Sequence, residues 1–145
     1  MGFETWHDYG YGLCVSKLHI DSIERLQKLL DSAPEYKRSI NEWLTETGIE
    51  NPRFDDYMEY DQDFYNGIAT IIKEVIQEAE GVEFTACSNF DGELYVIYGP
   101  SYPWFLPENE KALTAENIRD ILIKYISILT DENLIIDYCS VENGG

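Results

Sequence analysis

The sequence predicts an α+β fold: a two-layer arrangement in which a four-stranded, mostly antiparallel sheet carries about four helices on one side, in the order β-α-α-α-β-β-α-β. Apolar residues alternate with polar ones in three short segments, residues 10–16, 82–98 and 134–141, and this is the period of a strand. Between those segments apolar residues recur every three or four positions, as in amphipathic helices. The central segment contains a tight turn, which indicates two antiparallel neighbours.

After the first strand, residues 10–16, the sequence predicts two helices. Asp21 and Glu24 form a capping-box-like start for the first helix. Pro34 suits the first turn of the second helix, and Gly48 supplies its stop. We expect the pair to bury their apolar stripes against the rest of the chain. Those stripes are Ile23, Leu26, Leu29, Leu30 and Ala33, followed by Tyr36, Ile40, Trp43 and Leu44.

The middle of the chain predicts a third helix followed by a β-hairpin. Residues 49–63 contain Pro52 and many acids, so we expect an irregular connection or one short helical turn there. The third helix should cover residues 64–80, with Gly81 just past its end. Alternating segments on both sides of a turn at residues 89–92 then indicate the hairpin.

The C-terminal part predicts a loop, a helix and a last strand. Residues 99–107 contain three prolines, which lack the backbone donors that a central strand needs. Thr114 is a suitable cap for the last helix, and residues 134–141 should add a strand to the sheet. We find no repeat or linker, so residues 1–145 are expected to form one domain.

The chain is strongly acidic, with 28 Asp and Glu against 10 Lys and Arg and a formal charge of -18 at pH 7. Solubility of a small domain asks for a charge of only about 2 to 8 in magnitude. An excess of this size disfavours direct binding to nucleic acid or to an anionic membrane, because both require Lys and Arg. It favours a basic protein as the partner, although it would also suit an ordinary acidic protein kept in solution by its charge.

Targeting signals and disulfides are not indicated. The N-terminus lacks the basic and apolar regions of a secretory signal, and no apolar run approaches the ~18 residues of a membrane span. The cysteines, Cys14, Cys87 and Cys139, are odd in number and far apart, unlike a disulfide framework. We therefore expect a cytoplasmic location, with each cysteine acting as a small apolar residue inside a strand.

No motif indicates catalysis, a metal or a cofactor. The histidines and cysteines form no closely spaced zinc-ligand pair. The acids at 59, 61 and 63 lack the glycine and the final glutamate of a calcium loop, and Gly10 and Gly12 are not followed by a phosphate-binding lysine. We therefore predict a binding protein and not an enzyme, with no catalytic residue, no metal and no cofactor.

The acidic segment, residues 42–63, is the strongest candidate for a binding surface. It carries eight carboxylates against one base, Arg53, and residues 55–65 interleave acids with aromatic rings. Coiled as a helix, five acids in nine residues give one charge per ~2.7 Å, near the ~3.4 Å of one DNA strand. The acids would supply charge, and the tyrosines would contact the partner. The predicted partner-binding residues are Glu42, Glu46, Glu50, Asp55, Asp56, Tyr57, Glu59, Tyr60, Asp61, Asp63 and Tyr65.

In size and charge the chain resembles the short acidic proteins with which phages and mobile elements block host nucleases, anti-CRISPR proteins among them. This resemblance implies an inhibitor that imitates nucleic acid. Such an inhibitor would occupy the basic nucleic-acid-binding surface of a nuclease or a similar effector.

Three other interpretations remain open. An immunity or antitoxin protein that binds a basic toxin would use the same charges. A small ligand-binding domain or enzyme would have its site near Trp6, His7 and Tyr102. The acidic segment could also be a solvated loop whose rings only anchor it on the core, namely Phe54, Tyr57, Tyr60 and Phe64.

Overall fold

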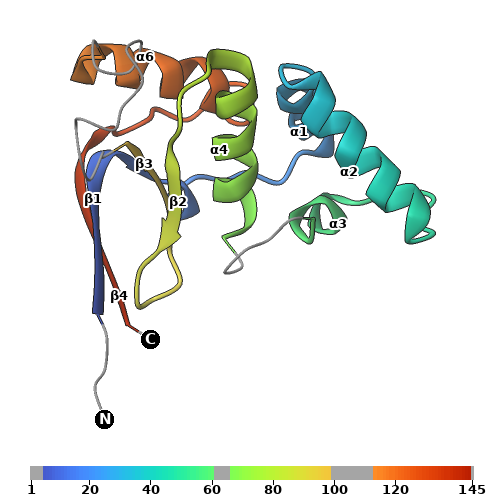
Figure 1. The fold of residues 1–145 in the computed structure, drawn as a ribbon, viewed down its shortest axis with the longest axis horizontal. Coiled ribbons are helices and arrows are strands. Elements are labelled where there is room, and N and C mark those ends of the chain that lie inside the picture. Colours follow the sequence, from blue (N-terminus) through green and yellow to red (C-terminus); the bar gives the residue numbers. More distant parts are fainter. Residues whose placement is uncertain (1–4, 61–65, 99–112, 145) are drawn as a thin grey trace.

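A computed structural model describes residues 5–60, 66–98 and 113–144 and shows an α+β fold (Figure 1). The sheet is antiparallel, with four strands in the order β2-β3-β1-β4. The predicted fold class and element order are confirmed. The strands are β1 (Thr5–Cys14), β2 (Thr85–Ser88), β3 (Leu94–Tyr98) and β4 (Asp137–Gly144). The helices are the 3-10 turn η1 (Val15–Lys17) and α1 (Ile23–Leu30), α2 (Pro34–Glu46), α3 (Phe54–Met58), α4 (Gly67–Glu80) and α6 (Ala115–Ile126).

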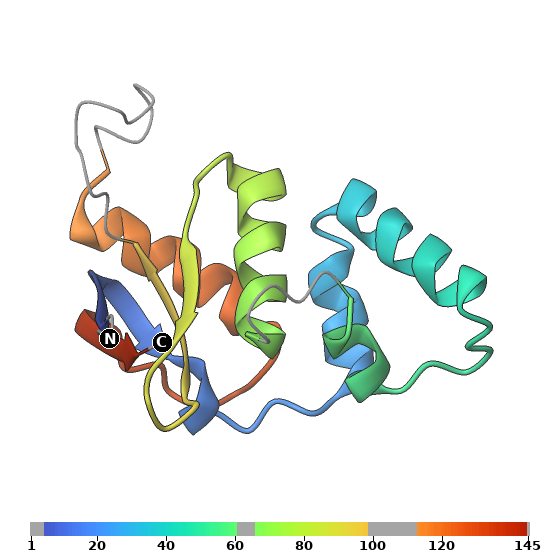
Figure 2. The ribbon, with the colours of Figure 1, turned by 60° about the horizontal axis from the view of Figure 1, so that its bottom comes forward.

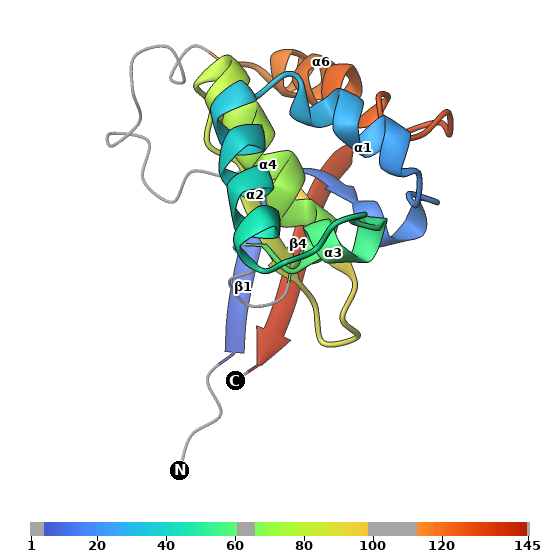
Figure 3. The same ribbon diagram turned by 90° about the vertical axis from the view of Figure 1, so that its right-hand side faces the viewer.

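The helices lie on one side of the sheet, as predicted, but in one region they form two layers. Helix α4 packs on β2 and β3, and α6 packs on β1 (Figure 2). Helices α1, α2 and α3 lie beyond α4, on its far side from the sheet (Figures 1 and 3). These three helices therefore project away from the sheet, and α2 and α3 carry four of the described acids of the acidic segment, Glu42, Glu46, Asp55 and Asp56.

Most predicted helix ends are confirmed. Pro34 occupies the first turn of α2, and Gly48 follows the end of that helix. Gly81 ends α4 in the left-handed conformation, with φ 71°, which glycine adopts without strain. Thr114 caps α6 through its hydroxyl, which accepts a hydrogen bond from Asn117 N. Residues at or next to each helix end therefore mark these boundaries in the sequence.

The start of α1 differs from the prediction by one residue. Ser22 is the N-cap, and its hydroxyl accepts a hydrogen bond from Arg25 N at 3.3 Å. Asp21 lies instead with its carboxylate 3.0 Å from Nε2 of His19. The predicted capping box of Asp21 and Glu24 is therefore wrong, because a neighbouring residue of equal capping ability takes the position.

Strands β1 and β4 are displaced from the predicted ranges. They pair antiparallel from Thr5 with Gly144 to Gly12 with Asp137. Strand β1 thus begins before residue 10, the predicted start, and β4 extends past residue 141, the predicted end. The added residues do not alternate in polarity, so only pairing between the two ends of the chain defines them as strand.

The main core lies between the sheet and the helices. Leu13 and Val96 are register partners that face the helices, and both are buried. Phe84 is 1% exposed, and its ring centroid lies 5.6 Å from that of Tyr98. The predicted alternation of the hairpin is confirmed on this face. The largest fully buried helical side chains of this core are Leu26, Leu29, Leu30, Ile40, Ile71, Ile72, Ile76, Leu122 and Ile126.

The opposite face of the sheet is also partly buried, because the sheet curls. Cys87, Ile97 and Val141 form a second apolar cluster there, and Ile97 is 1% exposed. Although β2 and β4 are the two ends of the strand order, they contact each other, and Phe90 N donates a hydrogen bond to Glu142 O at 3.1 Å. Strand alternation in the sequence does not predict this second cluster.

A polar contact joins the end of α4 to α6. The carboxylate of Glu80 accepts hydrogen bonds from the Tyr125 hydroxyl and from Lys124 Nζ, the latter at 3.2 Å. The hydrogen bond from Tyr125 lowers the pKa of Glu80, against the opposing effect of burial, and the nearby Lys124 acts in the same direction as the bond. Ionised Glu80 is therefore favoured by folding.

Replacing Tyr125 with phenylalanine should lower the free energy of unfolding by about 1.5 kcal/mol at about pH 7, since the hydrogen bond has a charged acceptor. The pKa of Glu80 in the folded chain lies below its ordinary value, so the stabilisation by ionised Glu80 is full above that ordinary value and is lost as the pH falls through the lowered pKa. We therefore expect the difference between Tyr125→Phe and the natural chain, measured by urea denaturation, to shrink in acid.

The matched control is Tyr138→Phe, because Tyr138 is 67% exposed and its hydroxyl has no hydrogen bond among the described residues. It should change the free energy of unfolding by less than about 0.5 kcal/mol at either pH. A Tyr125→Phe effect that stays constant from neutral to acid pH would show that Glu80 ionisation is not coupled to folding through this contact.

Candidate partner-binding surface

Five carboxylates of the acidic segment lie exposed on α2 and α3 or in the residues that follow these helices. Glu42 and Glu46 are one turn apart on α2, Glu50 follows that helix, Asp55 lies on α3, and Glu59 follows α3. Within the part of the chain that the structure describes, none of the five side chains forms an ion pair or a hydrogen bond. We call these five residues the α2–α3 acidic surface; Figure 3 looks onto the side of the molecule where α2 and α3 lie.

Two exposed bases, Arg53 and Arg38, lie near these carboxylates in the sequence. Arg53 precedes α3, and its backbone N–H donates to the Asp56 carboxylate at 2.8 Å. Through this hydrogen bond Asp56, which is half-buried, caps the start of α3. Arg38 is exposed one turn before Glu42, and Lys37 pairs with Asp31. Negative charge along α2 is thus concentrated in its C-terminal half.

The tyrosines are placed differently from the prediction. Tyr57 is 3% exposed and belongs to the core, so its ring cannot contact a partner in this conformation. Tyr60 is half-buried, and its ring packs edge-on against two rings of α2, with centroids 5.9 Å from Tyr36 and 5.6 Å from Trp43. Both rings hold α3 and the turn after it against the neighbouring helices. This is the anchoring role that the sequence left open as an alternative.

Three residues of the predicted site, Asp61, Asp63 and Tyr65, lie outside the described residues. Helix α3 ends at Met58, so the dense helical spacing of charge considered for residues 55–63 is described only for the first two of these acids, Asp55 and Asp56. The carboxylates that the structure brings together are spread over α2, its connection to α3, and α3 itself.

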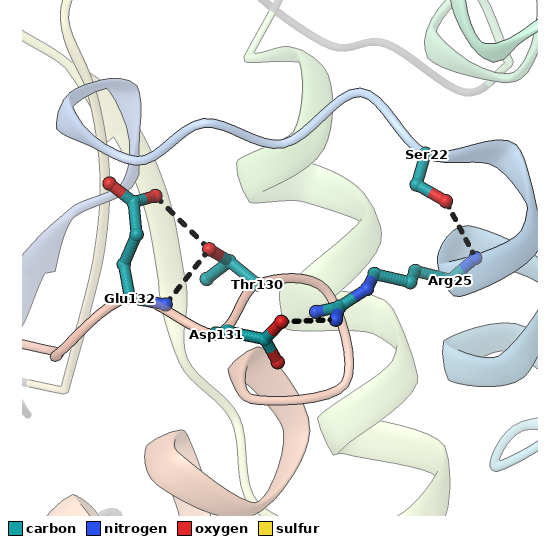
Figure 4. A network of polar contacts seen from close by, with 5 residues as sticks. All are labelled: Ser22, Arg25, Thr130, Asp131 and Glu132. Carbon is teal, nitrogen blue, oxygen red and sulfur yellow. Dashed lines mark hydrogen bonds and ion pairs between the residues drawn. The ribbon is translucent and has the colours of Figure 1, made fainter.

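Sequence reasoning missed the residues that hold α1 and α2 in place. The Glu78 carboxylate on α4 accepts hydrogen bonds from Glu35 N and Tyr36 N, at 3.0 and 2.9 Å, and so caps the start of α2 from another helix. Arg25 on α1 pairs with Asp131 at 2.7 Å, in the loop between α6 and β4 (Figure 4). Nothing in the local sequence indicates these contacts, because their partners are more than 40 residues away.

The alternative site is only partly described. Trp6 and His7 lie in β1, where they pair with Asn143 and Glu142 of β4. Tyr102 lies outside the described residues. Over residues 5–60, 66–98 and 113–144, no group of three or more His, Cys, Asp or Glu side chains is arranged to hold a metal ion. The same ranges contain no helix with the length and apolar character of a membrane span.

The three cysteines lie in strands, as predicted, and all are free. Cys139 pairs with Gly10, and Cys14 pairs with Tyr95. Cys14 and Cys139 are therefore offset by four residues on neighbouring strands, about 13 Å along them. A disulfide needs Cα atoms within about 7 Å, so this register excludes one between them. Burial, with the nearby Asp137 also contributing, raises the pKa of the Cys139 thiol and keeps it protonated.

Comparison of the chain with protein-family models, with curated proteins and with solved structures found no match.

Proposed function

We propose that this chain is an inhibitor that binds a basic protein and places the α2–α3 acidic surface in its nucleic-acid-binding groove. The observation that supports this proposal is a set of five exposed carboxylates without ion-pair partners among the described residues, in a molecule with a formal charge of -18. Carboxylates that are not neutralised by an ion pair produce a negative electrostatic potential at the surface, which can attract a partner. Such a field speeds association with a basic surface and selects against acidic ones.

The contacts that hold α2 and α3 in place favour binding of a partner without rearrangement of this surface. Asp56 caps α3, Tyr57 anchors it in the core, and Tyr60 packs on α2. Glu78 caps α2 from α4. Carboxylates carried on anchored helices lose little conformational entropy when a partner engages them, which preserves more of the binding free energy.

A groove built for nucleic acid is the basic surface that this arrangement suits best. Lys and Arg side chains of such a groove hold phosphates that follow one another about every 3.4 Å along the helix axis on each strand, and they bind through charge and not through sequence. Carboxylates can replace the phosphates there, and the partner then loses access to its nucleic acid. Binding should therefore be stoichiometric and should weaken as salt is added.

The test is capture from a host lysate by the immobilised chain at low and high salt, with a variant in which the surface is neutralised. Neutralisation is expected to weaken capture of a basic, nucleic-acid-handling protein at least about tenfold, since each exposed charge contributes a few tenths of a kcal/mol or more. Nucleic acid should compete with the natural chain for the captured protein. The substitutions are Glu42→Gln, Glu46→Gln, Glu50→Gln, Asp55→Asn and Glu59→Gln.

A matched control removes the same charge elsewhere. It neutralises five exposed carboxylates that form no ion pair in the described part of the chain, and it should bind almost as well as the natural chain. If both variants weaken capture of the partner equally, net charge alone and not the α2–α3 acidic surface is responsible. If nucleic acid does not compete for the captured partner, nucleic-acid mimicry is contradicted. The control substitutions are Glu24→Gln, Glu35→Gln, Asp91→Asn, Glu116→Gln and Asp120→Asn.

A further inference from the structure

A cavity of about 410 Å³ opens beside the curled face of the sheet, away from the α2–α3 acidic surface. Its walls come from Cys14 of β1, Tyr95 of β3, Cys139 of β4 and the segment that leads into β4. Pockets that bind small ligands occupy about 300–1,000 Å³. The size of this cavity therefore suits a bound group.

The lining is largely apolar and includes one unusually exposed side chain. Leu18 and Tyr95 are half-buried in the wall, whereas Ile135 at the rim is 85% exposed. Exposing a whole isoleucine costs free energy that a bound apolar group would recover. Ile135 is thus placed to cover an apolar group that enters the cavity.

The charged side chains at the cavity favour a ligand that carries a positive charge next to its apolar group. Glu132 and Asp137 line it against one base, Lys17. Both carboxylates are oriented by neighbours: Glu132 accepts from His19 N at 2.6 Å and from the Thr130 hydroxyl at 3.0 Å (Figure 4 shows the latter bond), and Asp137 accepts from Tyr138 N at 2.7 Å. Neither carboxylate forms an ion pair with Lys17 or with any other base among the described residues.

The neighbours of Tyr95 disfavour an anion beside it. Burial is the first cause that raises the pKa of the Tyr95 hydroxyl, and it would penalise an enclosed charge of either sign. The neighbouring Cys14 and Glu93 raise the pKa further, and this second effect disfavours negative charge only. A lysine or arginine side chain at the rim would instead be stabilised by Glu132 and Asp137.

We propose that this cavity is a docking site for a segment of another protein in which an apolar side chain stands next to lysine or arginine. The apolar side chain enters between Leu18, Tyr95 and Ile135, and the cation pairs with Glu132 or Asp137. A second copy of this chain is a poor occupant, since two molecules of charge -18 repel each other. This docking site is independent of the α2–α3 acidic surface.

The experiment is a nitrogen-15 NMR titration of the full chain with capped tripeptides. Lysine-tryptophan-lysine should give saturable shifts of the amides of Cys14, Tyr95 and Cys139, with a dissociation constant on the order of 1 mM. Glutamate-tryptophan-glutamate and lysine-glycine-lysine should each bind at least about fivefold more weakly, because the first reverses the charge and the second lacks the apolar group.

Two variants locate the binding and leave the fold intact. Ile135→Ser changes an exposed side chain, and it should weaken lysine-tryptophan-lysine at least about threefold. Phe90→Ser changes another exposed apolar side chain, 63% exposed and outside the cavity lining, and should not change the binding. The proposal is overturned if the acidic peptide binds equally, if shifts fall elsewhere or do not saturate, or if Ile135→Ser has no effect.

Discussion

Replacing Gly12 with alanine should lower the free energy of unfolding by about 3 kcal/mol or more, the upper end of the cost of overfilling a packed site. Gly12 pairs on one side with Ile97 of β3 and on the other with Asp137 of β4. An added Cβ would lie 2.8 Å from the Ile97 Cα and closer still to the carbonyl oxygen of Val96. These are backbone atoms, so they cannot rotate away. Urea denaturation followed by far-ultraviolet circular dichroism measures the effect.

Gly92→Ala separates this clash from the general cost of replacing a glycine. Gly92 has a φ of 78°, and an added Cβ there meets nothing within 4 Å. Only the left-handed conformation is then penalised, at about 1–2 kcal/mol. If Gly12→Ala lowers the free energy of unfolding no more than Gly92→Ala does, β1 and β3 do not approach as closely as the structure describes. The packing on the curled face of the sheet would then also be wrong.

Replacing Tyr57 with alanine should cost about 3 kcal/mol, as truncation of a buried aromatic side chain usually does. The Tyr57 ring is 3% exposed and belongs to the main core, and helix α3, which carries it, contacts α4. Because α3 has only five residues, it has little stability of its own and depends on this anchor. Amide hydrogen exchange in α3 should accelerate in Tyr57→Ala, alongside the loss measured by urea denaturation.

Tyr138→Ala is the matched truncation at an exposed position, since Tyr138 is 67% exposed. It should change the free energy of unfolding by less than about 0.5 kcal/mol. A Tyr57→Ala variant as stable as Tyr138→Ala, with unchanged exchange in α3, would mean that Tyr57 is not an anchor. Its ring would then be available to a partner, as the sequence suggested.

Helix boundaries were largely predictable because the interactions that set them are local. Pro34 and Thr114 each mark a helix start through the geometry or the hydrogen bond of one residue and its near neighbours. The exception is instructive. Asp21 and Ser22 are adjacent and both cap well, so only the path of the chain after η1 could choose between them.

The exposed part of the candidate surface was also predictable, and the role of its tyrosines was not. On α2 the helical period places Glu42 and Glu46 away from the buried Ile40 and Leu44. In a short acidic segment with no long period, an aromatic ring is as consistent with a partner contact as with an anchor. Packing against helices from other parts of the chain decided that Tyr57 is an anchor.

The amino-acid sequence by itself determined the charge of -18, the order of strands and helices, and the gathering of acids in residues 42–63, because composition and short-range periodicity encode these properties directly. Only the tertiary structure decided the curl of the sheet, the second apolar cluster, the contact of α1 with Asp131, and the cavity that Ile135 borders. The physical reason is the distance along the chain. The hydrogen bond from His19 N to Glu132 joins residues 113 positions apart, and such contacts depend on which surfaces pack together and not on the preferences of neighbouring residues.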